Sequence, residues 1–64
     1  MKQNMKVDNK GNIILVTERN NNLSVNYKNV KYTSFSEFTK DAFDVEENAT
    51  NLEEAIAVIE KYCK

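Results

Sequence analysis

The spacing of apolar residues changes about halfway along the 64-residue chain. In the first half, apolar residues alternate with polar ones or stand in a short β-branched run, which is typical of strands. In the second half they recur every three or four positions, which is typical of amphipathic helices. The change falls within residues 25–43, so we expect a small sheet that is followed by helical packing.

Polar segments divide the first half into short strands. Asp8–Asn12 holds the single glycine and predicts a hairpin loop, and the asparagines at 20–22 predict a second turn. At Lys28-Asn29 the apolar positions shift from odd to even numbers, which fits either a two-residue hairpin turn or a bulge. We favour the turn because Asn29 tolerates a positive φ. The prediction is an antiparallel meander of three to four strands.

The segment Ile13–Val16 has four consecutive apolar residues, three of them β-branched. A half-buried strand in a thin domain needs apolar side chains on one face only, so this segment predicts burial on both faces. Helices of the same chain can cover one face. A second copy of the chain is one way to cover the other, so we expect a homodimer through the Ile13–Val16 face.

Two helices are predicted in the second half. Ser34 and Glu37 have the spacing of a capping box. The inward positions that follow have helical spacing: Phe35, Phe38, Thr39, Ala42 and Phe43. Thr50 and Glu53 repeat the box signal ahead of a second apolar stripe. The fold class is therefore α+β: a single small domain over residues 1–64, in which the meander is followed by two α-helices packed on one face.

The chain has few of the residue types that catalytic and metal-binding sites require. The chain has no histidine, one cysteine (Cys63) and one glycine. Proton shuttles, zinc sites, internal disulfides and glycine-rich phosphate loops all need more of these residues. We therefore expect a non-enzymatic protein without a metal or cofactor. No apolar run approaches the ~20 residues of a membrane span, so a cytoplasmic location is expected and a membrane partner is not.

Charge is distributed unevenly along the chain. Residues 1–31 carry six basic and two acidic side chains, and residues 32–64 carry three basic and eight acidic ones. Such polarity can steer association with a charged partner. The acidic half predicts a partner-binding surface around the junction of the helices, made of Glu37, Asp41, Asp44, Glu46 and Glu47.

These acidic residues lead to the main functional hypothesis. Clustered carboxylates can dock onto the basic groove of a host protein that binds nucleic acid. Lysine outnumbers arginine eight to one and asparagine occurs ten times, a bias that indicates an AT-rich genome such as that of a low-GC bacterium or its phage. The hypothesis is a protein-binding module, an accessory inhibitor from a phage or mobile element that acts on a host defence protein, as an anti-CRISPR does.

The basic half supports an alternative, a small nucleic-acid-binding regulator. Its candidate contacts are Lys6, Arg19, Lys28 and Lys31, with Ser24, Asn26 and Thr33 as neutral hydrogen-bonding groups. Two observations disfavour it: the isoelectric point is about 5.3, and the alternation places Tyr27 and Tyr32 on the inward face, where they cannot stack on bases. A structural homo-oligomer that uses the Ile13–Val16 face is the third hypothesis.

Overall fold

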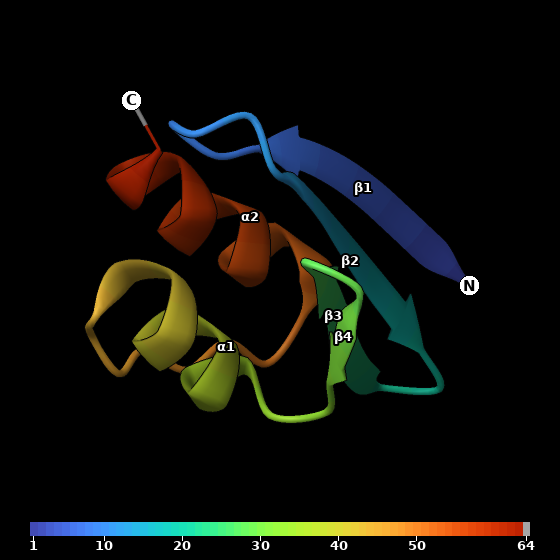
Figure 1. Cartoon of the computed structure of the whole chain (residues 1–64). Helices are drawn as coiled ribbons and strands as arrows, with labels where there is room; N and C mark the ends of the chain where they lie inside the picture. Colours follow the sequence, from blue (N-terminus) through green and yellow to red (C-terminus); the bar gives the residue numbers. More distant parts are fainter. Residues whose placement is uncertain (64) are drawn as a thin grey trace.

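A computed structural model describes residues 1–63 and shows an α+β fold, as predicted. Four strands form one antiparallel sheet in the order β1-β2-β3-β4, and two helices follow them in the chain (Figure 1). The elements are β1 (Lys2–Val7), β2 (Ile13–Arg19), β3 (Asn22–Tyr27), β4 (Val30–Tyr32), α1 (Phe35–Phe43) and α2 (Leu52–Tyr62). Within the described residues, no helix has both the length and the apolar character that a bilayer crossing requires.

Two-residue turns join the later strands. Asn20 and Asn21 have φ angles of 52° and 65°, and Lys28 and Asn29 have the same pair of values. Positive φ at both central residues is the signature of the type I′ turn, whose twist suits a hairpin. The phase shift at Lys28-Asn29 is therefore a turn, as favoured from the sequence, and the β3–β4 register continues directly from Tyr27 paired with Val30.

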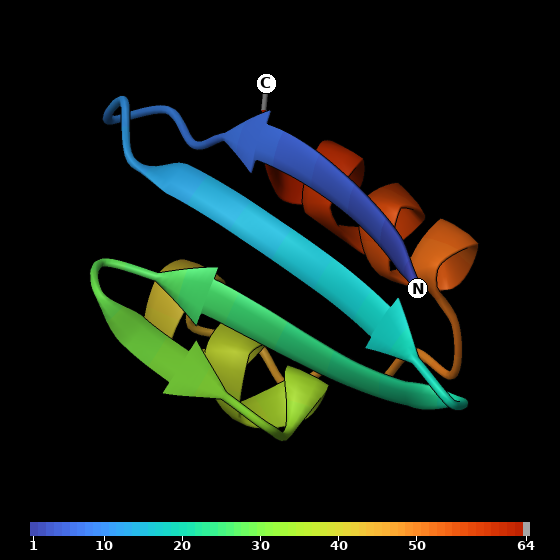
Figure 2. The same ribbon diagram turned by 90° about the vertical axis from the view of Figure 1, so that its right-hand side faces the viewer.

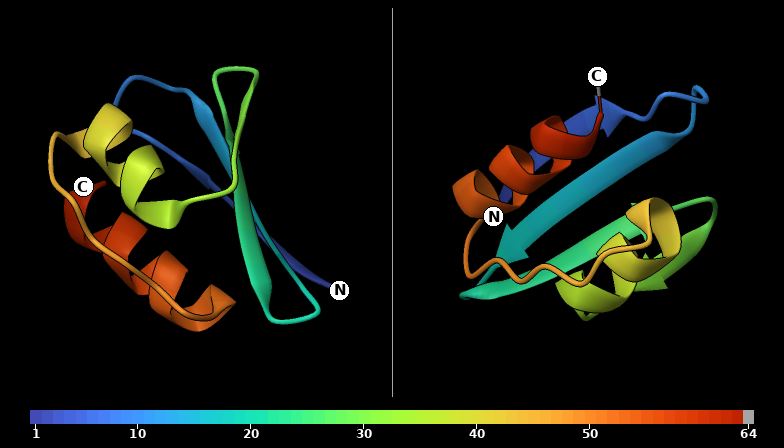
Figure 3. Two further views of the ribbon diagram at one scale, coloured as in Figure 1. Left: turned by 90° about the horizontal axis from the view of Figure 1, so that it is seen from below. Right: turned by 90° about the vertical axis from the view of Figure 1, so that its left-hand side faces the viewer.

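Both helices lie on the same face of the sheet, which the sequence also predicted. Helix α1 packs over β3 and β4, and α2 packs over β1 and β2 (Figure 3). Figure 2 shows the opposite face of the sheet, which no element within residues 1–63 covers. The molecule therefore has two layers, and the second face of the sheet is open to solvent.

The core lies between these layers. Ile14, Val16 and Val25 point inward from the sheet, and Phe38 and Ile59 meet them from the helices. Phe38 is fully buried, and its ring centroid lies 5.5 to 5.9 Å from those of four other aromatic residues: Tyr27, Tyr32, Phe35 and Phe43. Burial of each large apolar side chain contributes about 1.5–3 kcal/mol, so this aromatic cluster is the main source of stability in a small domain.

The predicted capping boxes are wrong in detail. The Ser34 side chain makes no cap bond to α1, because its Oγ lies 3.1 Å from the Ser36 hydroxyl instead. The N-cap of α2 is Asn51, whose side chain accepts from the Glu54 amide at 2.8 Å. Asparagine is a stronger cap than threonine, so the cap moves one residue beyond Thr50.

A residue far away in the sequence completes the α2 N-terminus. The Leu52 amide donates to the Glu18 carboxylate at 2.8 Å, so a strand side chain satisfies one of the free amides in the first turn of the helix. A carboxylate is also favoured at this end by the helix dipole. Sequence spacing alone gives no indication of this contact, which joins β2 to α2.

Some of the basic residues in the first half of the chain form ion pairs with acidic residues of the second half. Lys6 Nζ lies 2.8 Å from the Glu60 carboxylate, and Lys2 Nζ lies 3.9 Å from that of Glu53. Both pairs join the basic strand β1 to the acidic helix α2. Exposed pairs of this kind add little to stability, but they leave less of the opposite charge free for partners.

Asp8 closes the β1–β2 loop with a set of hydrogen bonds. Its carboxylate accepts from Tyr27 Oη at 2.6 Å and from the Asn12 amide at 2.7 Å, and also from the Asn12 side chain and the Lys10 amide. Partial burial raises the pKa of Asp8, but these hydrogen bonds outweigh it and lower the pKa from 3.8 to about 2.

This shift makes stability depend on pH in the acid range. Because the folded pKa is depressed, the contribution of Asp8 is present above about pH 4 and is lost as the pH falls toward 2. In urea titrations from pH 7 to pH 2.5, Asp8→Asn is expected to be less stable at neutral pH and to lose less stability on acidification. Asp44→Asn, at an exposed carboxylate, is the control. Equal acid sensitivity in Asp8→Asn and the unmodified protein would contradict the assignment.

Candidate protein-binding surface

Three of the five predicted acidic residues line one shallow hollow beside α1. Glu37 and Asp41 are one helical turn apart on α1. Glu46 reaches the same place from the interhelix linker, residues 44–51. Figure 1 shows α1 and this linker at the side of the molecule away from β1. This acidic hollow has a volume of about 310 Å³ and is lined by Tyr32, Ser36, Glu37, Lys40, Asp41 and Glu46.

Asp41 is held in place by the sheet. Tyr32 Oη donates to its carboxylate at 2.7 Å. The hydrogen bond to Asp41 and partial burial both raise the pKa of Tyr32, so the phenol remains a donor at neutral pH. The Asp41 carboxylate therefore has a fixed position at the edge of the hollow, with further acceptor capacity for a partner.

Thr39 anchors the linker that carries Glu46. Its side chain is fully buried, and Oγ1 donates to the Ser36 carbonyl at 3.0 Å while accepting from the Glu47 amide at 3.0 Å. A single hydroxyl thus ties the linker to the helix. Sequence periodicity placed Thr39 among the apolar positions of α1 but gave no indication of this bond, because the linker lies eight residues further along the chain.

The other two predicted acidic residues are separated from the hollow. Glu47 accepts from Tyr62 Oη and from Lys61 Nζ, and the bonds from Tyr62 and Lys61 lower its pKa. Its carboxylate therefore joins the linker to the end of α2. Asp44 ends α1 in the left-handed conformation, at a φ of 60°, and pairs with Lys40 at 3.2 Å. Neither residue lines the acidic hollow.

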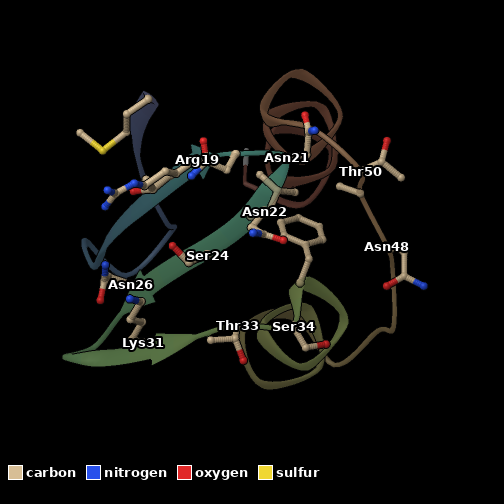
Figure 4. Close-up of a pocket in the computed structure, with 16 residues that line it drawn as sticks. Arg19, Asn21, Asn22, Ser24, Asn26, Lys31, Thr33, Ser34, Asn48 and Thr50 are labelled. Atoms are coloured by element: carbon tan, nitrogen blue, oxygen red, sulfur yellow. The ribbon is translucent and has the colours of Figure 1, made fainter.

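The four predicted basic contacts do not gather in one place. Lys6 lies on the helix side of the sheet with Glu60, and Lys28 Nζ lies 5.4 Å from the centroid of the Tyr27 ring. Arg19 and Lys31 line the same larger hollow of about 900 Å³ beside β3 (Figure 4). They are not neighbours, because Arg19 is in register with Asn22 and Lys31 with Asn26, further along β3.

Neutral polar groups make up much of this larger polar hollow. Ser24, Asn26 and Thr33, predicted as hydrogen-bonding groups, all line it. Figure 4 also shows side chains that the sequence did not single out as contacts, from the β2–β3 turn, the first residue of β3 and the interhelix linker: Asn21, Asn22, Asn48 and Thr50. The aromatic residue that lines the hollow, Phe35, is only 6% exposed, so it offers little surface for stacking.

The open face of the sheet is apolar at one corner. Met5, Val7 and Ile13 are 60%, 56% and 55% exposed, and Leu15 lies half-buried beside Met5. Ile14 and Val16 of the same strand are fully buried under the helices. The run Ile13–Val16 is thus covered on one face only, and the predicted burial of the second face does not occur within a single copy of the chain.

Comparison with known proteins gave no match: no family model, no curated protein and no solved structure corresponds to this chain. Function must therefore be inferred from three surfaces. They are the acidic hollow beside α1, the polar hollow at the β3 edge, and the apolar corner of the open sheet face.

Proposed function

We propose that the protein is a non-enzymatic protein-binding module that inhibits a basic host protein. The partner class is a nucleic-acid-binding protein of a host defence system. The carboxylates around the acidic hollow would bind the positively charged groove of that protein. On this proposal the protein acts as an accessory inhibitor from a phage or mobile element, in the manner of an anti-CRISPR.

The observation that carries the proposal is the convergence of Glu37, Asp41 and Glu46 on one hollow. Two of these carboxylates come from a helix and one from a linker. Tyr32 donates a hydrogen bond to Asp41 of the helix, and Thr39 accepts one from the Glu47 amide of the linker. Pre-positioned charges lose little conformational entropy when a partner binds. The arrangement suits recognition of lysine and arginine side chains at fixed spacing.

Charge also favours fast association with such a partner. The opposite edge of the sheet carries Lys2 and Lys6, which are paired with α2, whereas Glu37 and Glu46 have no ion-pair partner among the described residues. Glu37 and Glu46 therefore contribute unpaired negative charge beside α1, next to Lys40, which pairs with Asp44. Complementary potentials of this kind raise association rates and discriminate against acidic partners.

The test begins with capture of partners from a bacterial lysate treated with nuclease, using the immobilised protein. The double variant Glu37→Lys/Glu46→Lys is expected to lose the captured partner and to slow its association by about tenfold at low salt. The purified partner should release its bound nucleic acid when the unmodified protein is added. Surface plasmon resonance at several salt concentrations measures the rate, and a filter-binding assay measures the release.

The double variant Glu53→Lys/Glu60→Lys is the matched control, because both residues are exposed carboxylates on α2. It makes the same charge change away from the acidic hollow and should leave capture intact. If the two double variants weaken capture equally, net charge and not the hollow determines binding. Capture that survives Glu37→Lys/Glu46→Lys would exclude the acidic hollow as the binding surface.

The polar hollow favours a second candidate function, a small nucleic-acid-binding regulator. Arg19 and Lys31 lie there among amide and hydroxyl groups that can bind phosphate and sugar oxygens (Figure 4). A salt titration with single-stranded DNA and RNA tests this function. Binding near 50 mM salt that weakens steeply with added salt, and that is lost in Arg19→Ala/Lys31→Ala, would support it over the inhibitor.

A further inference from the structure

Strand β1 is an edge strand whose outer side has no partner in the described chain. It pairs with β2 along its full length, from Lys2 opposite Glu18 to Val7 opposite Ile13. Figure 2 shows β1 at the margin of the sheet, with no further strand beside it and with α2 behind the sheet. The main-chain groups on that margin are therefore free to accept another strand.

The register shows which main-chain groups these are. The Asp8 amide donates to the Asn12 carbonyl at 2.9 Å, so the N–H group of Asp8 points toward the β2 side. In an antiparallel strand, the N–H and C=O groups of successive residues point alternately to the two sides of the strand. The even-numbered residues of β1 therefore also bond to β2. The amides and carbonyls of Gln3, Met5 and Val7 therefore point outward, and their side chains lie on the open face of the sheet.

This edge lacks the devices that protect edge strands from pairing. The β1–β2 register runs without a bulge, and the chain has no proline. The two lysines of β1 lie on the helix side, where α2 carboxylates pair with them. The row on the open face, Gln3, Met5 and Val7, is uncharged and exposed.

We infer that β1 pairs antiparallel with β1 of a second copy of the chain, which joins the two sheets into one. The register that pairs all three outward residues within the strand places Met5 opposite Met5 of the second copy and Gln3 opposite Val7. Each such pair exchanges two main-chain hydrogen bonds, about six in all. This interface lies at the edge of the sheet, whereas the sequence predicted a dimer through the Ile13–Val16 face.

The side chains in this register are complementary to themselves under a two-fold axis. On the open face, Met5 packs against Met5 of the second copy, and Val7 lies opposite Gln3 of the second copy. On the helix side, Lys2 lies opposite Asp8 of the second copy, so the charges there are of opposite sign. A partner of unrelated sequence would not produce this match, and it is the reason that we assign the edge to a second copy.

Sedimentation equilibrium of the full chain from micromolar to millimolar concentration tests the inference. The unmodified protein is expected to form a dimer. Met5→Lys places two like charges opposite each other at the two-fold axis and should raise the dimer dissociation constant by about tenfold or more. Asn26→Lys, the same charge change on β3 of the same face, should leave the dissociation constant unchanged.

Two further variants separate edge pairing from stacking of the open faces. Total synthesis of the chain with an N-methyl group on the Met5 amide removes one outward donor without removing a bond to β2, and should weaken the dimer. Ile13→Lys, on the second strand, should weaken it less than Met5→Lys does. Equal effects of Met5→Lys and Ile13→Lys, together with no effect of N-methylation, would establish face-to-face stacking and overturn the inference.

A protein that stays monomeric up to millimolar concentration would overturn it as well. Circular dichroism melts of each variant check that the monomer is folded, as expected for exposed positions. The inference is independent of the proposed function, because the acidic hollow is lined by α1, β4 and the linker, at the opposite edge of the sheet. Failure of the dimer would leave the binding of a basic partner untouched.

Discussion

Replacement of Phe38 with alanine is expected to lower the free energy of unfolding by about 3–5 kcal/mol. The ring is fully buried and lies within 6 Å, centroid to centroid, of four other aromatic rings, so its removal leaves a cavity that its neighbours cannot fill. A domain of this length has only roughly 3–10 kcal/mol of stability in total. The variant should therefore be largely unfolded at 37 °C.

Urea denaturation followed by far-ultraviolet circular dichroism measures this loss. Phe38→Leu keeps most of the volume, so it should remain folded and show a smaller loss that can be quantified. Val30→Ala is the matched truncation at a residue that is 48% exposed, and it should change stability by less than about 0.5 kcal/mol. A loss for Phe38→Ala close to that of Val30→Ala would show that the aromatic cluster is not the centre of the core.

Replacement of Thr39 with valine is expected to cost about 1–3 kcal/mol, although the two side chains have nearly the same shape. Valine leaves the Glu47 amide and the Ser36 carbonyl without the hydroxyl that now bonds to both. The linker between the helices should then open more often. The position of Glu46 at the acidic hollow depends on that linker, so stability and partner binding should fall together.

Amide hydrogen exchange at Glu47 is the specific measurement, because that proton loses its acceptor. Exchange at Glu47 should speed up in Thr39→Val far more than at the core amide of Ile59. Thr39→Ser keeps the hydroxyl and removes one methyl group, so it should protect the Glu47 amide while costing about 1 kcal/mol. Rapid exchange in both variants would assign the effect to packing and not to the hydrogen bond.

These two residues show how far the sequence predicts this structure. The helical spacing from Phe35 to Phe43 placed Phe38 and Thr39 on the buried side of α1, and both are fully buried. The role of each within the core was not predictable. Which rings surround Phe38, and which amide Thr39 accepts from, depends on where the strands and the linker lie in space.

The sequence also predicted the acidic candidate site only in part. The acidic residues of the second half were visible as a cluster in the sequence, but only Glu37, Asp41 and Glu46 line the same hollow. Glu47 is drawn away because Tyr62 and Lys61, which reach it from α2, bond to its carboxylate. Side-chain partners from another element decided its direction, and such partners leave no periodic signal.

By itself, the sequence determined the class and order of the elements. Alternation, helical spacing and the asparagines of the turns act between near neighbours in the chain, so they specify the strands, the hairpins and the helices before any long-range contact forms. The N-cap of α1 is Ser34, as predicted, although its side chain makes no cap bond. The N-cap of α2 was predicted one residue too early, since Thr50 and Asn51 are both suitable and a bond from the Glu54 amide to Asn51 decides between them.

Only the tertiary structure decided which surfaces remain for partners. The run Ile13–Val16 is apolar on both faces, so its residues do not indicate which face the helices cover. Packing of α1 and α2 on the side of Ile14 and Val16 left Ile13 beside Met5 on the open face. The physical reason is the alternation of side chains across a strand: burial of one set exposes the other, and the choice between the sets depends on contacts with distant residues.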